Sequence, residues 1–186
     1  GTFGDFGIYS FNGNKIATGS VGGALICKNP STAAHARKLA HQAKENTPHF
    51  EHHEIGYNYA LSNLAAAIIC AQLEQLNQKV QQRRAIFSAY CEQLDQMAQY
   101  SFQQELDGAF ANRWLSAFVF SSQSPIQAEN LRKDLSRRNI ESRPLWKPLH
   151  LQKAFSGCLS FLNQQAEQLF ASGICLPSTT LVSLHQ

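Results

Sequence analysis

Apolar residues recur at helical spacing over one long stretch, from Ser62 to about Gln96. Ser62 is a residue type that caps helix N-termini, and Leu64 and Ile68 begin the apolar pattern after it. The later positions keep a seven-residue spacing, through Leu73, Leu76, Val80, Phe87, Tyr90 and Leu94. We therefore expect one long helix, or two helices joined end to end, with the other elements arranged before and after it.

The sequence before this stretch predicts two strands and a helix. Residues 6–11 alternate apolar and small side chains, as a short strand does, and the continuous apolar run at 22–27 is typical of a fully buried strand. Asn29-Pro30-Ser31 is a helix-start signal, and the pattern after it predicts a helix over residues 32–44. A polar, histidine-rich loop should follow.

Lys15 lies between the two predicted strands, in the polar loop Asn12-Gly13-Asn14-Lys15. Asparagine and glycine tolerate left-handed backbone and tight turns, so we expect an irregular loop that holds the lysine at a strand end. In α/β proteins such loops often carry the chemistry. The residues leave two interpretations open: a solvated surface cation, which is the commoner role of a loop lysine, or an amine that attacks a carbonyl group.

The sequence after residue 96 predicts a smaller α+β unit. Residues 100–111 show little periodicity and contain the turn signal Asp107-Gly108. Beyond them we expect a strand over 114–121, a helix over 127–138, a strand over 140–143 ended by Pro144, a helix over 161–172 and a strand over 174–176. Strands and helices in this order indicate an α+β sandwich with helices on one face of a sheet.

Composition excludes several classes of function. With 44% hydrophobic and 16% charged residues, the 186-residue chain is globular and long enough for a substantial core. A net charge of +3, with scattered basic pairs, does not indicate a nucleic-acid partner. The five cysteines lie far apart, which fits a reducing compartment, and no apolar run reaches membrane-spanning length. We therefore predict a cytoplasmic protein without membrane insertion.

Three histidines and two glutamates have a spacing that resembles a metal site: His49, Glu51, His52, His53 and Glu54. Zinc sites usually need a rigid scaffold and a fourth ligand, and no cysteine lies near these residues in the sequence. We interpret the segment as an exposed polar loop and predict no metal site.

Ordered sequence blocks over nearly the whole chain resemble a known family. The blocks are residues 4–16 with Thr18-Gly19 and Gly22-Gly23, Gly56-Tyr57-Asn58-Tyr59, Leu61-Ser62-Asn63, Ala71-Gln72-Leu73-Glu74, Asn112-Arg113-Trp114-Leu115, residues 140–150 and Leu176-Pro177-Ser178. They are similar to blocks of the DegT/DnrJ/EryC1/StrS sugar aminotransferases, which are fold-type I enzymes dependent on pyridoxal 5'-phosphate. The resemblance is greatest to the branch that aminates UDP-linked 4-keto-6-deoxy-N-acetylhexosamines on the way to bacillosamine-type sugars.

The resemblance implies an α/β fold, namely the C-terminal part of a fold-type I pyridoxal phosphate-dependent transferase. Residues 1–61 would form the end of the large cofactor-binding domain, residues 62–111 the long connecting helix and a linker, and residues 112–186 a small α+β domain. Relatives carry a long part of the large domain ahead of the lysine strand. We therefore expect a C-terminal portion with little or no transaminase activity alone.

The resemblance also implies roles for named residues. Lys15 would form the Schiff base with pyridoxal 5'-phosphate and move the proton in transamination. Ser10 would hydrogen-bond the cofactor phosphate, with a buried structural hydroxyl as the alternative. Asn58 would reach across a homodimer interface toward the neighbouring cofactor, with a turn-forming asparagine as the alternative. The family often has arginine where this chain has Ala60, so no contact is carried over to that position.

Arg143 and His150 lie in a proline-punctuated segment that could line a sugar-nucleotide cleft. Cationic side chains suit phosphate or carboxylate groups, and Trp146 between them could stack on a ring. The alternative is that Trp146 packs between Pro144 and Pro148 for structural reasons alone.

From the resemblance we predict a transaminase that moves an amino group from glutamate to a nucleotide-linked 4-keto-6-deoxy sugar, for glycan or protein glycosylation. Two alternatives stay open. One is a related sugar dehydratase, although family members with that chemistry replace the lysine that is present here as Lys15. The other is a non-catalytic dimerisation module, whose contact surface would be the long helix from Ser62 onward.

Overall fold

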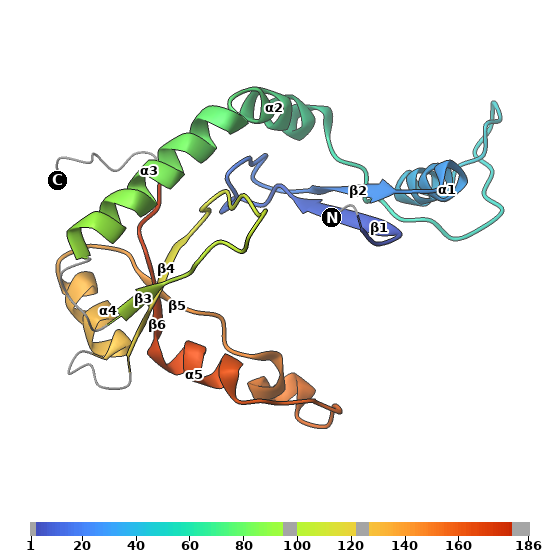
Figure 1. The fold of residues 1–186 in the computed structure, drawn as a ribbon. Coiled ribbons are helices and arrows are strands. Elements are labelled where there is room, and N and C mark those ends of the chain that lie inside the picture. The colour runs from blue at the N-terminus through green and yellow to red at the C-terminus, as the bar shows by residue number, and fades with distance from the viewer. Residues whose placement is uncertain (1–2, 95–99, 122–126, 180–186) are drawn as a thin grey trace. The chain divides into compact units, whose positions relative to one another are not determined.

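The computed structural model describes residues 3–94, 100–121 and 127–179 (Figure 1). The chain divides into two compact units, residues 1–77 and residues 78–186. The three segments expected from the sequence, with boundaries after residues 61 and 111, stay a prediction. None of the described helices combines the length and the apolar character that crossing a membrane requires.

The first unit begins with a two-stranded antiparallel sheet. Strand β1 (Phe6–Ser10) pairs with β2 (Gly23–Cys27), and both lie where the sequence predicts strands. The expectation that the second strand is fully buried is wrong, because Leu25 and Ile26 are 48% and 47% exposed. Helix α1 packs against β2, and Leu25 and Ile26 stay about half exposed despite this contact.

Helix α1 (Pro30–Ala40) begins as predicted, since the Asn29 side chain accepts a hydrogen bond from the backbone N–H of Ser31 at 2.8 Å. The predicted end at residue 44 is wrong. Gln42 and Ala43 have φ angles of 67° and 52°, which are left-handed and cannot continue the helix. The chain turns back there, and the Gln42 N–H donates to the Tyr57 carbonyl oxygen at 2.9 Å.

Helices α2 (Asn63–Glu74) and α3 (Leu76–Leu94) confirm the prediction of two helices joined end to end, with the junction at Gln75. Ser62 caps α2 as expected, because its Oγ accepts a hydrogen bond from the Ala65 N–H at 3.2 Å. The predicted end near Gln96 lies outside the described residues. Helix α2 is apolar on two sides: Ile69 is buried, whereas Leu64 is 81% exposed.

The second unit is built on a four-stranded antiparallel sheet with strand order β3-β4-β6-β5 (Figure 1). Its elements are β3 (Tyr100–Phe102), β4 (Ser116–Phe120), α4 (Ala128–Arg137), β5 (Arg143–Pro144), two short 3₁₀ turns (Leu149–Leu151 and Lys153–Phe155), α5 (Gln165–Ser172) and β6 (Gly173–Leu176). The predictions of β4, α4 and β6 are confirmed to within a few residues. Strand β3 lies in a region where the sequence predicts no regular element.

Three element boundaries in this unit differ from the prediction. The strand predicted from residue 140 begins only at Arg143, as β5. Pro144 belongs to β5 instead of ending the strand before it, and this is tolerated because β5 is an edge strand, where a missing N–H leaves no partner unsatisfied. Helix α5 begins at Gln165 instead of residue 161. Gln164 has a φ angle of 63°, so the chain becomes helical only after that residue.

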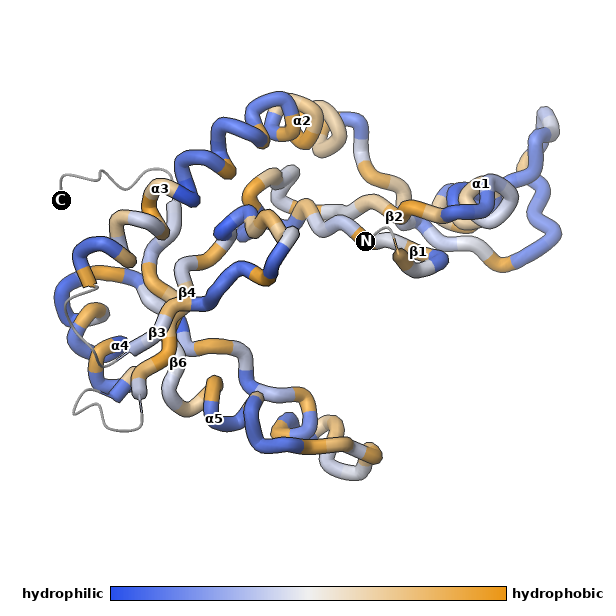
Figure 2. The backbone as a smooth tube through the Cα atoms, in the orientation of Figure 1, coloured by the Kyte–Doolittle hydropathy of each residue, from blue (hydrophilic) through white to orange (hydrophobic). Residues whose placement is uncertain are grey.

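The core of the second unit lies between the sheet and α4. Phe118, Phe120, Ala128 and Ile174 are buried together, and the half-buried side chains around them are Tyr100, Phe102, Leu131, Leu135 and Leu176. Hydrophobic colouring concentrates on β4 and β6 accordingly (Figure 2). Strand β4 alternates buried and half-buried residues, because successive side chains of a strand point to opposite faces of the sheet.

An ion-pair cluster ties the segment before β4 to α3. Arg84 holds Glu105 with two hydrogen bonds, of 2.7 and 3.0 Å, and donates a third to the Ala111 carbonyl oxygen. The Arg113 guanidinium lies 3.8 Å from the centre of the Phe87 ring. Together with the backbone N–H of Ala111, the Arg84 side chain lowers the pKa of Glu105 to about 2. The carboxylate therefore fixes this loop within its unit.

Candidate functional site

Lys15 lies in a loop that is closed by backbone hydrogen bonds at both ends. The Phe11 N–H donates to the Gly22 carbonyl oxygen at 3.0 Å, and the Gly19 N–H donates to the Phe11 carbonyl oxygen at 3.1 Å. Within the loop, the Lys15 N–H donates to the Asn12 carbonyl oxygen at 3.0 Å, and the Lys15 residue is half-buried. The backbone of the loop therefore holds the lysine at the end of β1, as the sequence predicts.

Ser10 is the last residue of β1 and lies next to this loop. Its Oγ accepts a hydrogen bond from the Asn12 N–H at 3.4 Å, and the residue is exposed. The hydroxyl is therefore exposed and has one structural contact, and the predicted contact with a cofactor phosphate stays a prediction. A primary amine and an accessible hydroxyl thus stand on one short segment, a combination that suits a ligand with both a carbonyl group and an anionic group.

Thr18 is a loop residue whose role sequence reasoning missed. Its hydroxyl donates to the Phe11 carbonyl oxygen at 3.1 Å and accepts from the Ser20 N–H at 2.8 Å. These bonds link residues 18–20 of the loop to Phe11, where the loop begins. The signal was present in the sequence, because threonine followed by glycine and serine is a composition typical of side-chain-stabilised turns.

Asn58 belongs to the same unit as Lys15 but lies on a different segment. It forms an isolated antiparallel bridge with His41, just after α1. Its neighbours Tyr57 and Tyr59 are exposed, and their rings stack with centroids 5.0 Å apart. Backbone bonds from Tyr57 and Tyr59 to the carbonyl oxygens at the end of α1 hold this segment in place. The predicted contact of Asn58 with a cofactor stays a prediction.

Arg143 and His150, the predicted substrate-binding residues, both belong to the second unit and both have carboxylate partners. Arg143 donates to Glu141 at 2.6 and 2.8 Å, and both side chains are well exposed. His150 pairs with Glu167 at 2.8 Å and its side chain is only 19% exposed, so it joins the first 3₁₀ turn to α5. The His150 pair therefore has a structural role whether or not it also binds substrate.

Trp146, between these two residues, is 66% exposed, and its ring lies 5.9 Å from that of Trp114. The contact that the structure shows for this ring is thus with Trp114. The alternative of packing between the flanking prolines does not account for that ring pair.

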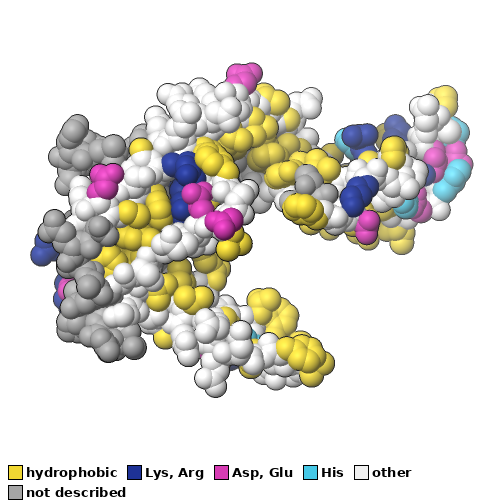
Figure 3. Space-filling view, in the orientation of Figure 1, with side chains coloured by type: hydrophobic (Ala, Val, Ile, Leu, Met, Phe, Trp, Pro, Cys, Tyr) yellow, Lys and Arg dark blue, Asp and Glu magenta, His cyan; other side chains and the backbone are white. Residues whose placement is uncertain are grey.

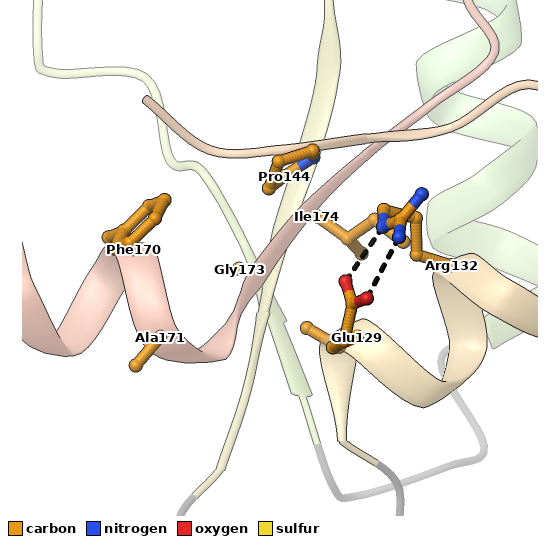
Figure 4. Close-up of a pocket in the computed structure, with 8 residues that line it drawn as sticks. Glu129, Arg132, Pro144, Phe170, Ala171, Gly173 and Ile174 are labelled. Carbon is orange, nitrogen blue, oxygen red and sulfur yellow. Dashed lines mark hydrogen bonds and ion pairs between the residues drawn. The ribbon is translucent and has the colours of Figure 1, made fainter. Parts of the chain in front are cut away.

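A small pocket of about 210 Å³ opens in the second unit between α4, β5, α5 and β6 (Figure 4). Glu129 and Arg132 form a two-bonded ion pair at its edge, with distances of 2.7 and 2.8 Å, and this pair lowers the pKa of Glu129 to about 2. Typical pockets for small-molecule ligands have about 300–1,000 Å³. The pocket is too small for a sugar nucleotide, and its charged groups already satisfy each other.

The histidine-rich loop after α1 forms a network of ion pairs. Figure 3 shows acidic, basic and histidine side chains mixed around α1 and this loop. The pairs are His35 with Glu54, Lys38 with Glu45 and Glu54, His49 with Glu51, and His53 with Glu45 and Glu51. Among the described residues, no group of three or more candidate ligands is arranged to hold a metal ion.

Known proteins resemble this chain over nearly its whole length. The model of the DegT/DnrJ/EryC1/StrS aminotransferase family matches residues 1–186. The Bacillus subtilis protein EpsN, assigned as a pyridoxal phosphate-dependent aminotransferase, is 43% identical over 96% of this chain and 46% of its own length. GDP-perosamine synthase of Escherichia coli O157:H7 is 31% identical over 100% of this chain and 50% of its own length. The chain spans about half the length of these relatives.

Solved structures show the same fold. The aminotransferase TlmJ from Streptoalloteichus hindustanus has a TM-score of 0.88 at 28% identity, over 98% of this chain and 49% of that chain. The fold class predicted from the sequence, the C-terminal part of a fold-type I transferase, is confirmed by this likeness and by the mixed α/β architecture. Since the family model covers every residue, the chain belongs to the DegT/DnrJ/EryC1/StrS aminotransferase family.

Proposed function

We propose that Lys15 is the residue to which pyridoxal 5'-phosphate attaches, in a protein that transfers an amino group to a sugar. The observation that carries the proposal is the closed loop, which holds the half-buried residue Lys15 directly after the strand that ends with the exposed Ser10. Membership of an aminotransferase family supports it. When bound, the cofactor supplies an aldehyde that condenses with a primary amine, losing one water, and a ring that withdraws electrons.

The residues fit this cofactor through the chemistry of their groups. The Lys15 amine is the nucleophile that an aldehyde requires, and the Ser10 hydroxyl is a hydrogen-bond donor for a phosphate oxygen. In transamination, the Lys15 amine, once released, would move the proton at the α-carbon of the amino donor. The backbone bonds of the loop keep the lysine at one place, which a proton transfer needs.

For the substrates we propose glutamate as the amino donor and a nucleotide-linked 4-keto-6-deoxy sugar as the acceptor. Relatives named as GDP-perosamine synthase and as UDP-4-amino-4,6-dideoxy-N-acetyl-β-L-altrosamine transaminase support this class. Their sugars and nucleotides differ from each other, so they do not favour the bacillosamine branch over others. The proposal is therefore the class of keto-sugar nucleotide, without a choice of sugar.

A Ser10→Ala substitution tests the proposed site. We expect the affinity for pyridoxal 5'-phosphate to fall about tenfold, because one hydrogen bond to a charged phosphate is lost. The affinity for pyridoxal, which has no phosphate, should stay unchanged. Absorbance titrations of both ligands with the wild-type chain and the variant measure the two effects.

The comparison of the two ligands separates a phosphate contact from a general loss of structure. Equal weakening of both ligands, or no weakening of the phosphate form, would contradict the role of Ser10. Failure of the wild-type chain to bind pyridoxal 5'-phosphate at all would contradict the proposed function itself. Ser88→Ala on α3, also an exposed serine, serves as the matched control and should leave both affinities unchanged.

We further propose that two copies of the protein associate through the outer side of α2. The exposed apolar side chains Leu64 and Ile68 lie four residues apart on this side of the helix, and an apolar surface of this kind favours association. Leu64→Glu with Ile68→Glu should shift the sedimentation coefficient toward that of the monomer at equal concentration. Gln81→Glu, an exposed polar position on α3, is the control. A wild-type chain that is monomeric at every concentration tested would refute this.

A further inference from the structure

The loop that carries Lys15 touches α2 at a residue without a side chain. A Cβ placed on Gly19 would lie 2.7 Å from Cγ1 and 2.8 Å from Cδ1 of Ile69, and 3.0 Å from the Ala65 carbonyl oxygen. Side chains do not tolerate contacts below about 3.0 Å without movement. Ile69 is 4% exposed, so its side chain fills the space that the glycine leaves. The loop and α2, adjacent in Figure 1, are packed directly against each other.

A second glycine extends the same contact. Gly22 has a φ angle of 92°, a left-handed conformation that favours glycine, and a Cβ placed there would overlap the Leu61 side chain. The part of the loop that leads into β2 therefore contacts Ile69 at Gly19 and Leu61 at Gly22. Ala17, between Lys15 and these glycines, is buried as well. The loop that holds Lys15 thus packs against the segment from residue 61 to residue 69.

The contact at Gly19 lies at a hydrogen bond that closes the loop around Lys15. The Gly19 N–H donates to the Phe11 carbonyl oxygen, and this bond closes the part of the loop that contains Lys15. The same carbonyl oxygen accepts the hydroxyl of Thr18. A displacement of Gly19 therefore shifts its hydrogen bond to Phe11, and the position of Lys15 depends on this bond.

If a side chain is added at position 19, we expect the loop to move and helix α2 to stay in place. Ile69 is β-branched and lies inside α2, where such side chains have one strongly preferred rotamer. The Ala65 carbonyl oxygen is part of the helix backbone, which intrahelical hydrogen bonds hold. The loop is irregular, with Ser20 at a φ angle of 70°, and has no repeating backbone ladder of the kind that holds a helix.

We propose that Ile69 is a positioning residue for Lys15: packed into the gap at Gly19, its side chain sets the place of the loop that carries the amine. Ile69 acts through its contact with Gly19. The proposal rests on the proposed function only in treating Lys15 as the site of cofactor attachment.

Five variants of the 186-residue chain test this: Gly19→Ala, Ile69→Ala, Gly13→Ala, and Gly19→Ala combined with either Ile69→Ala or Ile69→Val. Each is incubated with pyridoxal 5'-phosphate and reduced with borohydride, and the labelled fraction of Lys15 is measured by mass spectrometry. Gly19→Ala should lower the labelling at limiting cofactor about tenfold, because small misplacements of a reacting group cost large factors in rate. Gly19→Ala combined with Ile69→Ala should return it to within about twofold of wild type, since both overlapping atoms are removed.

Two matched controls sharpen the result. Gly19→Ala with Ile69→Val should not recover, because valine keeps a γ-carbon where the overlap at 2.7 Å arises. Gly13→Ala, in the same loop, should label like wild type, because its Cβ would meet only the Ser20 carbonyl oxygen at an ordinary 3.8 Å. Equal labelling of Gly19→Ala and Gly13→Ala, or equal recovery with valine and alanine at position 69, would overturn the proposal.

A second measurement does not use the cofactor. Hydrogen exchange of the backbone amides of Lys15 and Gly19 should be faster in Gly19→Ala and in Ile69→Ala than in wild type. In the double variant Gly19→Ala with Ile69→Ala, exchange should be slower than in Gly19→Ala alone. Unchanged exchange in both single variants would overturn the positioning role even if one of them labels poorly. If wild type shows the exchange pattern but no labelling of Lys15, the proposed function fails while the positioning of the loop stands.

Discussion

Lys15→Ala should abolish covalent attachment of pyridoxal 5'-phosphate at the loop between β1 and β2. The expected loss is complete, because a methyl group has no nitrogen to attack the aldehyde and no neighbouring group can replace it at the same place. Lys15→Arg should fail in the same way, although it keeps the positive charge, because a guanidinium stays protonated and is not a nucleophile. Absorbance of the protein with added cofactor, before and after borohydride reduction, measures the attachment.

Lys44→Ala is the matched control for this experiment. Lys44 is an exposed lysine of the same unit, and its ammonium lies 4.3 Å from the centre of the Phe50 ring. Pyridoxal phosphate reacts slowly with exposed lysines in general, so this variant shows how much labelling is unspecific. If Lys15→Ala and Lys44→Ala lose similar small amounts of label, Lys15 has no special reactivity, and the proposed function would have to be abandoned.

Ile174→Ala should destabilise the second unit by about 2–5 kcal/mol, the usual range for truncating a buried isoleucine to alanine. Ile174 is 0% exposed and lies on β6, an inner strand of the sheet, within the core that contains Phe118 and Phe120. Both tryptophans of the chain, Trp114 and Trp146, belong to this unit. Their fluorescence during unfolding by urea therefore reports on its stability, and the midpoint should fall while the slope stays similar.

Leu159→Ala provides the comparison for this effect. Leu159 is 87% exposed in the same unit, and surface substitutions usually change stability by less than about 0.5 kcal/mol. A midpoint for Ile174→Ala as high as that of Leu159→Ala would show that the side chain at position 174 is not part of a packed core. That result would contradict the core in which Ile174 is buried with Phe118 and Phe120.

Elements whose pattern is local could be predicted from the sequence. Helices α2, α3 and α4 show apolar positions at helical spacing, and Ser62 and Asn29 mark helix starts by side-chain chemistry that acts within three residues. The end of α1 could not be predicted, because it depends on Gln42 pairing with Tyr57, which is distant in the sequence. Strand β3 was missed for a related reason, since three residues are too few to show a period.

Burial of β2 shows a different limit. Its apolar residues are continuous, as in a buried strand, yet Leu25 and Ile26 are about half exposed in the first unit. Hydropathy reports how a side chain prefers to be placed, and it does not show which other elements cover it. The same limit applies to the outer side of α2, where the pattern is apolar and the side chains are exposed.

The candidate site was predictable where it is contiguous in the sequence. Ser10 ends β1 and Lys15 follows five positions later in the adjoining loop, so turn chemistry predicted both from one segment. The contact between Gly19 and Ile69 was not predictable, because neither residue type signals a partner and the two lie on separate elements. Arg143 and His150 were chosen for their charge, and the structure shows each with a glutamate partner that sequence spacing did not reveal.

The central claim is that the amine of Lys15 is the attachment point of pyridoxal 5'-phosphate. Its most direct test is to incubate the wild-type chain with limiting cofactor, reduce with borohydride, digest, and locate the added mass on the peptides. The account predicts that the label lies on the peptide containing Lys15, well above the level on the exposed lysines Lys28 and Lys44. Label spread evenly over these lysines would contradict it.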